Sequence, residues 1–454
     1  MTTDQLDDAV RDALKSWHPD GPPGPAGAVE RIVRRRRRRN AARALGMALA
    51  LTGLGVGTVL ATGPGGGRTQ PPAKPSTEGG VLWRTALPGN AWDACAIGPR
   101  AVYCQGDAYD AYAVDPATGK LAWTRKAKVA DGGGSPAAVL PGVRDGVLYT
   151  FADHAPGSSR AGTDLVAVDV GSHKELWRQE LADEHRDRIS AVLFGDKVLA
   201  NTPSFKSVKA LDGKTGRVLW SHRWKQADCD RAVIGDVPYL TCSPSGDKAP
   251  QRSSVVRLDP KTGAAETVAT FAGKSVRVGV DGDTVLLAAA ANGKDIGKKG
   301  RFDLVRVNTG TGDVSRHKAD GITMGPVADG VLVGSSGAGR AVAYDAGTGK
   351  RMWQRQLGFT LRAEDTGDPT TRELASDPVI DIGRRVAYYL GPDGKLAGLD
   401  LDSGAVRWRG TVKLPKTPVQ EGIAPELMLD GHELVGQVGG TLFRVKPVPA
   451  QAGS

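Results

Sequence analysis

A short unit recurs along most of this chain: three hydrophobic residues, an acidic residue, a Thr-Gly or Ser-Gly pair, and then tryptophan. A fixed internal period of about 40–50 residues marks a propeller or a solenoid. In the four clearest copies the tryptophan follows the acidic residue by eight positions: Asp115 and Trp123, Asp212 and Trp220, Asp345 and Trp353, and Asp400 and Trp408. The repeat therefore constrains the fold more than any other feature of the sequence.

Three weaker copies extend the series. Asp169 leads to Trp177 at the same interval, but His173 stands where glycine is expected. The units that begin at Asp259 and Asn308 keep the Thr-Gly pair and lack the tryptophan. With the four clear copies they make seven units in which both halves follow each other in the chain.

The eighth copy is divided between the two ends of the repeat region. Residues 442–445 resemble the strand before the turn, and residues 81–83, which include Trp83, resemble the strand after it. Paired apolar runs around tight Gly-Asp turns precede the units, so each repeat predicts four antiparallel strands. We therefore expect an all-β, eight-bladed propeller over residues 81–448. Its last blade is closed by the N- and C-terminal strands, which leaves the ring without an exposed edge.

The acidic residues and tryptophans of the repeat have structural roles in this interpretation. A carboxylate can accept N–H bonds from the residues that follow it in a turn, and glycine adopts the left-handed conformation that closes the turn. One indole at a fixed place in most blades is typical of packing between neighbouring sheets. Paired carboxylates can also act as a general acid and base, but these recur once per blade, on turns. We expect no catalytic residue among them.

The repeat resembles that of the pyrroloquinoline-quinone-like propeller family, and the resemblance covers about residues 79–448. That family includes quinoprotein dehydrogenases and many non-enzymatic members, among them the propeller lipoprotein of the outer-membrane assembly machinery and sensor domains of membrane kinases. The dehydrogenases typically carry two adjacent cysteines and a calcium site of acidic and amide ligands. No two cysteines are adjacent here, and no calcium site can be matched residue by residue. The resemblance therefore implies a non-enzymatic member, without a cofactor or a metal.

The four cysteines form two pairs by position. Cys95 with Cys104, and Cys229 with Cys242, each bracket the first hairpin of a repeat. Cross-strand disulfides are the natural interpretation, and they indicate an oxidising, extracytoplasmic compartment. A zinc site is the alternative, but spacings of nine and thirteen residues without a nearby histidine do not favour it.

The N-terminal segment predicts a membrane anchor. Six consecutive arginines end at residue 39, and residues 44–62 contain no charge, which is just long enough to span a bilayer. The positive-inside rule places residues 1–40 in the cytoplasm and the propeller outside, joined by a Gly/Pro-rich linker at 63–80. A cleaved twin-arginine export signal is the rival interpretation. The arginine run could also bind nucleic acid, but its position against an apolar stretch favours topology, and we expect no nucleic acid partner.

Residues 3–17 predict a short amphipathic helix, which could dock on a cytoplasmic partner or simply lie on the membrane surface. Residues 449–454 are expected to form a disordered tail.

Loop length gives the only indication of a binding site within the propeller. The long polar connections all belong to one face, where scaffolded loops usually carry recognition. They are residues 152–164, 243–254, 292–301, 358–376 and 413–424. Basic residues make that face a candidate for binding: Lys298, Lys299, Arg301, Arg362 and Arg372. Solvated loop charge is the alternative for any one of them.

These observations favour a single-pass membrane protein that displays a binding or scaffolding propeller outside the cytoplasm, with an unknown protein or envelope ligand as its partner. The first alternative is a quinoprotein dehydrogenase without the usual markers. The second is an envelope sensor that signals inward through the N-terminal helix.

Overall fold

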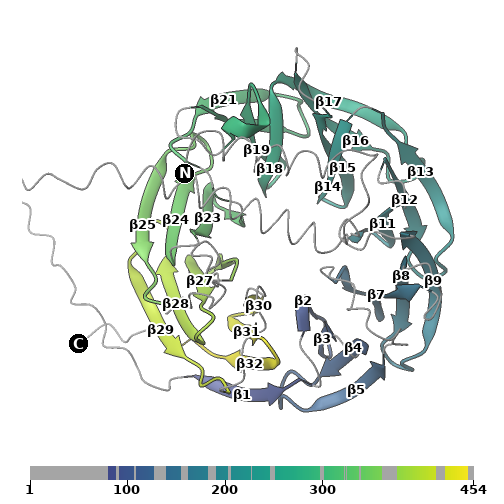
Figure 1. Ribbon diagram of the computed structural model, residues 1–454, viewed down its shortest axis with the longest axis vertical. Helices are drawn as coiled ribbons and strands as arrows, with labels where there is room; N and C mark the ends of the chain where they lie inside the picture. The colour runs from purple at the N-terminus through teal and green to yellow at the C-terminus, as the bar shows by residue number, and fades with distance from the viewer. Residues whose placement is uncertain are drawn as a thin grey trace, which may run out of the picture.

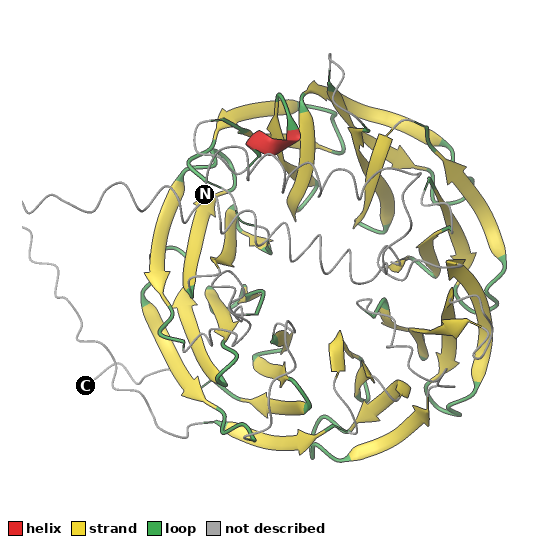
Figure 2. Ribbon diagram, viewed as in Figure 1, coloured by secondary structure: helices red, strands yellow, loops and turns green. Residues whose placement is uncertain are grey.

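Eight four-stranded antiparallel sheets form a closed ring in the computed structural model (Figure 1). The sheets are arranged like the blades of a propeller, with strands as the main secondary structure throughout (Figure 2). The structure describes residues 80–87, 91–106, 109–126, 140–154, 162–182, 191–202, 206–225, 227–245, 251–296, 301–321, 323, 325–336, 339–359, 376–415 and 425–447.

The first seven blades follow the chain, each from its innermost strand to its outermost strand (Figure 1). Blades 1 to 3 are β2 (Ala91–Ile97), β3 (Val102–Gly106), β4 (Tyr109–Val114) and β5 (Leu121–Lys126); β6 (Gly142–Arg144), β7 (Val147–His154), β8 (Gly162–Asp169) and β9 (Glu175–Ala182); and β10 (Ala191–Phe194), β11 (Lys197–Asn201), β12 (Ser207–Asp212) and β13 (Val218–Arg223). Blades 4 and 5 are β14 (Ala227–Ile234), β15 (Val237–Pro244), β16 (Arg252–Leu258) and β17 (Ala265–Ala272); and β18 (Lys274–Asp281), β19 (Thr284–Ala290), β20 (Asp303–Asn308) and β21 (Val314–Lys318), with a short 3₁₀ helix, η2 (Gly293–Asp295), after β19. Blades 6 and 7 are β22 (Val327–Ala328), β23 (Val331–Ser336), β24 (Arg340–Asp345) and β25 (Arg351–Gln356); and β26 (Val379–Asp381), β27 (Val386–Leu390), β28 (Lys395–Asp400) and β29 (Val406–Thr411).

Blade 8 is built from both ends of the propeller, as the divided repeat predicts. Its strands are β30 (Glu426–Asp430), β31 (Glu433–Val438) and β32 (Thr441–Val445), with β1 (Val81–Ala86) as the outermost. Trp83 is paired with Arg444 in this ladder. The Lys446 N–H donates to the Gly80 carbonyl at 2.7 Å, so both ends of the propeller meet at one place. The ring is therefore closed by hydrogen bonds between segments more than 350 residues apart in the chain.

The connections lie on two opposite faces because the four strands of each blade alternate in direction. The turns between first and second strands and between third and fourth strands lie on one face, here called the turn face. The connections between second and third strands and between blades lie on the other, here called the loop face. Tight turns on the turn face require positive φ, which Gly195 adopts at 48° and Asp329 at 49°.

The hydrophobic core lies between blades rather than at a single centre. One cluster joins blades 2 and 3 through Phe151, Trp177 and Leu211, and another joins blades 6 and 7 through Trp353 and Tyr389. The middle strands thus bury both their faces against the two neighbouring sheets, which explains their nearly continuous apolar runs.

The loop between β7 and β8 is shorter than the sequence predicts, because these strands continue their pairing to His154 and Gly162. β15 and β16 also reach Pro244 and Arg252, but there they pair with β14 and β17, and their own pairing ends at Cys242 and Ser254. The ladder extends through polar residues because the strands here are held by backbone hydrogen bonds rather than by apolar side chains.

Several predictions concern segments outside the described residues: the cytoplasmic segment 1–40 with its helix at 3–17, the span at 44–62, the linker except for Gly80, and the tail at 449–454. Within the described part of the chain, no helix has the length and apolar character needed to cross a membrane.

Candidate functional site

The repeat carboxylates close the turns between third and fourth strands. Asp115 Oδ1 accepts hydrogen bonds from the backbone N–H of Ala117 at 3.0 Å, from the N–H of Thr118 at 2.8 Å and from the Thr118 hydroxyl at 2.8 Å. The same bonds to the third residue recur at Asp169, Asp212, Asp259, Asp345 and Asp400. These bonds give the repeat carboxylates the turn-closing role that the sequence predicts.

These hydrogen bonds also favour the charged carboxylate. The Thr118 hydroxyl holds the pKa of Asp115 below its usual range, and Ser172 and Thr215 do the same for the pKa of Asp169 and Asp212. Burial alone would raise the pKa of Asp400, but hydrogen bonds from Ser403 and Arg407 lower it to about 2. A carboxylate whose pKa is lowered is ionised at neutral pH and is a weaker base than an ordinary aspartate.

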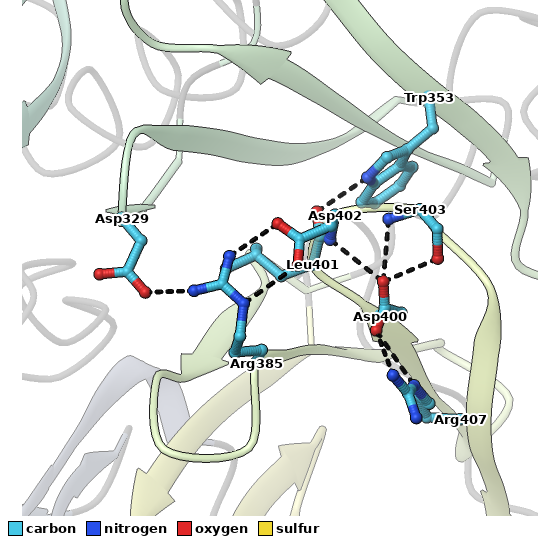
Figure 3. A network of polar contacts seen from close by, with 8 residues as sticks. All are labelled: Asp329, Trp353, Arg385, Asp400, Leu401, Asp402, Ser403 and Arg407. Carbon is cyan, nitrogen blue, oxygen red and sulfur yellow. Dashed lines mark hydrogen bonds and ion pairs between the residues drawn. The ribbon is translucent and has the colours of Figure 1, made fainter.

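Four of the repeat tryptophans bond to the following blade. Trp353 Nε1 donates to the Leu401 carbonyl of the following blade at 2.9 Å (Figure 3). A Cβ atom at Gly404 would lie only 2.6 Å from this indole, so the turn glycine is needed for space as well as for its φ of 67°. Equivalent bonds run from Trp83 to Pro116, from Trp177 to Gly213 and from Trp220 to Pro260, at 2.7, 2.8 and 3.1 Å. We call each such contact an indole latch.

A β-bulge precedes each of these tryptophans, and the sequence analysis missed it. All six outermost strands that carry tryptophan at the repeat position have a register shift immediately before it, as between Leu211 and Ala210 where Trp220 is aligned. A bulge turns a side chain out of its regular alternation. Here it aims the indole at the next blade. The sequence signal for the bulge was the interval of eight residues between the acidic residue and the tryptophan, taken together with the fixed length of the turn.

Two blades modify the latch. In blade 2, His173 adopts the left-handed conformation of the missing glycine, with φ 61°, and its ring stacks on Trp123 with centroids 4.9 Å apart. At the seam between blades 7 and 8, Trp408 Nε1 is buried and has no hydrogen-bond partner in the part of the chain that the structure describes. The divided blade explains this, since no continuous turn holds a carbonyl beneath that indole.

A polar network braces blades 6 and 7 on the turn face (Figure 3). Arg385 adopts φ 51°, and its guanidinium contacts Asp402 at 2.6 and 3.0 Å and Asp329 of the preceding blade at 2.5 Å. Positive φ at a non-glycine residue is unfavourable. The three carboxylate contacts stabilise it, so this network belongs to the frame of the ring.

The predicted disulfides are present. Cys95 pairs with Cys104 across β2 and β3, and Cys229 pairs with Cys242 across β14 and β15, each with Cα atoms 4.0 Å apart. Both therefore lock the innermost hairpin of a blade.

Of the five basic residues predicted for the binding face, the described part of the chain contains Arg301. Its side chain is 66% exposed on the loop face of blade 5 and lies 3.5 Å from Asp295. Two residues further on, Asp303 accepts ion pairs from Arg316 and Lys318 at 2.7 Å each. We call Arg301, Arg316 and Lys318 the blade 5 basic edge. Lys298, Lys299, Arg362 and Arg372 lie outside the described residues, so their place on this face stays a prediction.

The described residues hold no group of three or more His, Cys, Asp or Glu side chains arranged to bind a metal ion. The polar contacts named above thus serve turn closure, seam contacts and the exposed basic edge of blade 5.

Comparisons with known proteins agree with the fold. The profile of the family described as outer membrane protein assembly factor BamB matches residues 56–201, 110–355 and 204–422. The outer membrane protein assembly factor BamB of Yersinia pestis is 21% identical over 297 residues, which is 62% of this chain and 68% of that protein. Among solved structures, BamB from Moraxella catarrhalis gives a TM-score of 0.52 at 17% identity and covers 81% of this chain and 99% of that chain.

A computationally designed protein, Ika8, gives the same TM-score of 0.52 at 16% identity, covering 82% of this chain and all of that chain. Similarity of this degree to natural and designed structures establishes the fold alone. The family profile, by contrast, matches most of the sequence, and the matched copies carry the repeat whose turns and latches are described above. The chain therefore belongs to the pyrroloquinoline-quinone-like β-propeller repeat family, in the branch whose profile is described as outer membrane protein assembly factor BamB.

Proposed function

We propose that this chain is a non-enzymatic binding or scaffolding module of the cell envelope, held at a membrane by residues 44–62 with its propeller outside the cytoplasm. The observation that carries this proposal is the use of the repeat chemistry. The repeat carboxylates are bonded within their own turns, and most of the repeat indoles are bonded across seams. What remains is a rigid ring that presents loops, which is the usual architecture of a recognition scaffold.

The two disulfides support an extracytoplasmic location, since such bonds persist in oxidising compartments. The family description and the relative from Yersinia pestis both refer to assembly at the outer membrane, which supports a protein partner in the envelope. The Gly80–Lys446 contact lies where β1 begins, on the turn face, so a tether that precedes Gly80 joins that face. The loop face would then point away from the membrane.

Topology can be tested with the full chain. Alkaline phosphatase fused after residue 454 should be active, and the protein should resist carbonate extraction until residues 44–62 are deleted. An inactive phosphatase fusion that is stable and correctly expressed would refute the extracytoplasmic placement.

The non-enzymatic role has its own test. The purified full chain, loaded with pyrroloquinoline quinone and calcium, is assayed with alcohols, sugars and a dye acceptor, alongside a quinoprotein dehydrogenase as a positive control. We expect no turnover above the dye background. Sustained turnover would establish the quinoprotein alternative.

A further inference from the structure

The outermost strand of blade 5 differs from the other seven. β21 pairs with β20 from Val314 to Lys318 without any register shift, whereas each of the other outermost strands contains a bulge. The structure describes all eight of these strands in full. Bulges twist an edge away from pairing with another chain. β21 is therefore the one rim strand with a regular, straight edge.

The bulge is absent together with the tryptophan. Arg316 occupies the indole position, and without a bulge its side chain points back to blade 4, where Nη2 donates to the Ala272 carbonyl at 2.9 Å. The seam to blade 6 is held instead by Asp320, whose N–H donates to the Gly349 carbonyl at 3.1 Å and whose Oδ2 accepts from the Arg351 N–H at 3.2 Å. The blade thus keeps its contacts with both neighbours while it leaves the outer edge regular.

The register fixes which backbone groups face outward. The Asn308 N–H donates to the Asp313 carbonyl at 3.0 Å, and hydrogen-bonded and non-hydrogen-bonded pairs alternate in an antiparallel ladder. Counting from that pair, Ser315 and His317 bond to β20, so Val314, Arg316 and Lys318 direct their N–H and C=O groups away from the sheet. These are the groups that a further strand would use.

The side chains on this edge are exposed and basic. None of the five residues of β21 is buried, and the Lys318 side chain is 71% exposed. Arg301 and exposed Lys294 stand at the loop-face end of the same blade. Arg301 lies beside Asp295, whereas Arg316 and Lys318 share the carboxylate of Asp303. Two cations that share one carboxylate leave this row of the strand with a net positive charge, which favours an anionic partner.

We propose that β21 binds an extended acidic segment of a partner protein by β-strand addition, with acidic residues at every second position opposite Arg316 and Lys318. Side chains on one face of a sheet repeat every two residues, so Arg316 and Lys318 form one row that an added strand would match. Backbone bonds supply affinity in this mode of recognition, and the alternate side chains supply specificity. This inference rests on the proposed binding role and names the chemistry of its partner.

The experiment measures binding of a fluorescent peptide of alternating Glu and Thr to the purified full chain at low salt. Three variants separate charge from backbone pairing. Arg316→Gln removes the guanidinium and keeps the outward N–H, Arg316→Pro removes both, and Lys318→Glu reverses a charge. Proline at a position that does not bond to β20 is compatible with an edge strand. Circular dichroism and thermal melting of each variant establish that the ring is intact.

Arg316→Gln should weaken binding by about two- to fivefold, as expected for one exposed ion pair. Arg316→Pro should weaken it by at least a further fivefold or so, because an outward hydrogen bond is lost as well. A peptide with N-methyl groups on the bonding edge should not bind, although its charge is unchanged.

Equal affinities for the Gln and Pro variants, or normal binding of the N-methylated peptide, would overturn the strand addition. If polyphosphate or anionic lipid vesicles displace the peptide as effectively as unlabelled peptide does, the edge is only a charge surface and the inference fails. If the Arg316→Pro variant still captures a partner protein on the loop face, the proposed binding function stands, but β21 is not the site that carries it.

Discussion

Replacement of Trp353 and of Trp408 by phenylalanine should have different effects on stability, although both indoles are buried at equivalent seams. Trp353 is 5% exposed and donates to the Leu401 carbonyl, which is itself fully buried. Trp353→Phe removes volume from the seam, which lowers the free energy of unfolding by about 1 kcal/mol. It also leaves that carbonyl without its donor, which lowers the free energy of unfolding by about 1–3 kcal/mol. The sum is a loss of about 2–4 kcal/mol in the free energy of unfolding.

Trp408 is 6% exposed, but its Nε1 has no hydrogen-bond partner within the described residues. Trp408→Phe loses the same volume and removes a buried N–H that has no partner among the described residues, so the two effects largely cancel. We expect a change within about 1 kcal/mol of zero.

Urea unfolding of the full chain, followed by far-ultraviolet circular dichroism, compares the two variants with the parent, and an unchanged slope against urea shows that the same surface is exposed in each. In thermal melts the difference should be about 2–8 °C, because unfolding entropy grows with chain length and about 1 kcal/mol corresponds to only 1–2 °C in a ring of this size. Equal destabilisation by the two substitutions would refute the reasoning that the divided blade leaves Trp408 without a bond.

Three further predictions concern the ring. Deletion of residues 79–87 should remove β1, expose β32 as an edge and cause aggregation in light scattering, whereas deletion of residues 64–76 should leave the melting temperature unchanged; equal behaviour would contradict closure by β1. Stability should stay level above about pH 4 and fall as the pH drops toward 2, because the pKa of Asp115, Asp169, Asp212 and Asp400 is lowered on folding and the unfolded carboxylates titrate near pH 4; an Asp400→Asn variant should show a shallower fall in acid melts. Reduction should cost about 2–3 kcal/mol per disulfide, measured in urea with and without reductant, and free thiols in the untreated protein would refute the pairing.

The fold was largely predictable from the sequence because its signals are local and repeated. Each of the seven continuous units keeps the Asp-to-Trp interval, the turn glycine or both, and the outlying segment at Trp83 was recognisable as the missing strand of the last repeat. The cysteine pairs were equally clear, since each brackets a hairpin turn. Local chemistry of this kind does not depend on distant contacts.

The candidate site was less predictable because it depends on what the repeat lacks. Arg316 reads in the sequence as a lost tryptophan, and only the regular pairing of β21 shows that the bulge is lost with it. The stacking of His173 on Trp123 joins side chains 50 positions apart on different blades, and no sequence pattern encodes it. The unpartnered Nε1 of Trp408 likewise lies at the seam with the divided blade, which only ring closure brings about.

Site-specific photo-crosslinking in living cells tests the central claim, that the loop face binds an envelope protein, most directly. A photoreactive amino acid replaces Lys294 or Arg301 on the loop face of the full chain, or Lys214 or Lys261 on the turn face as matched exposed controls. We expect a discrete crosslinked protein of the envelope from the loop-face positions and none from the turn-face positions. Well-expressed protein that gives no product at either loop-face position, or gives the same product from both faces, would contradict the account.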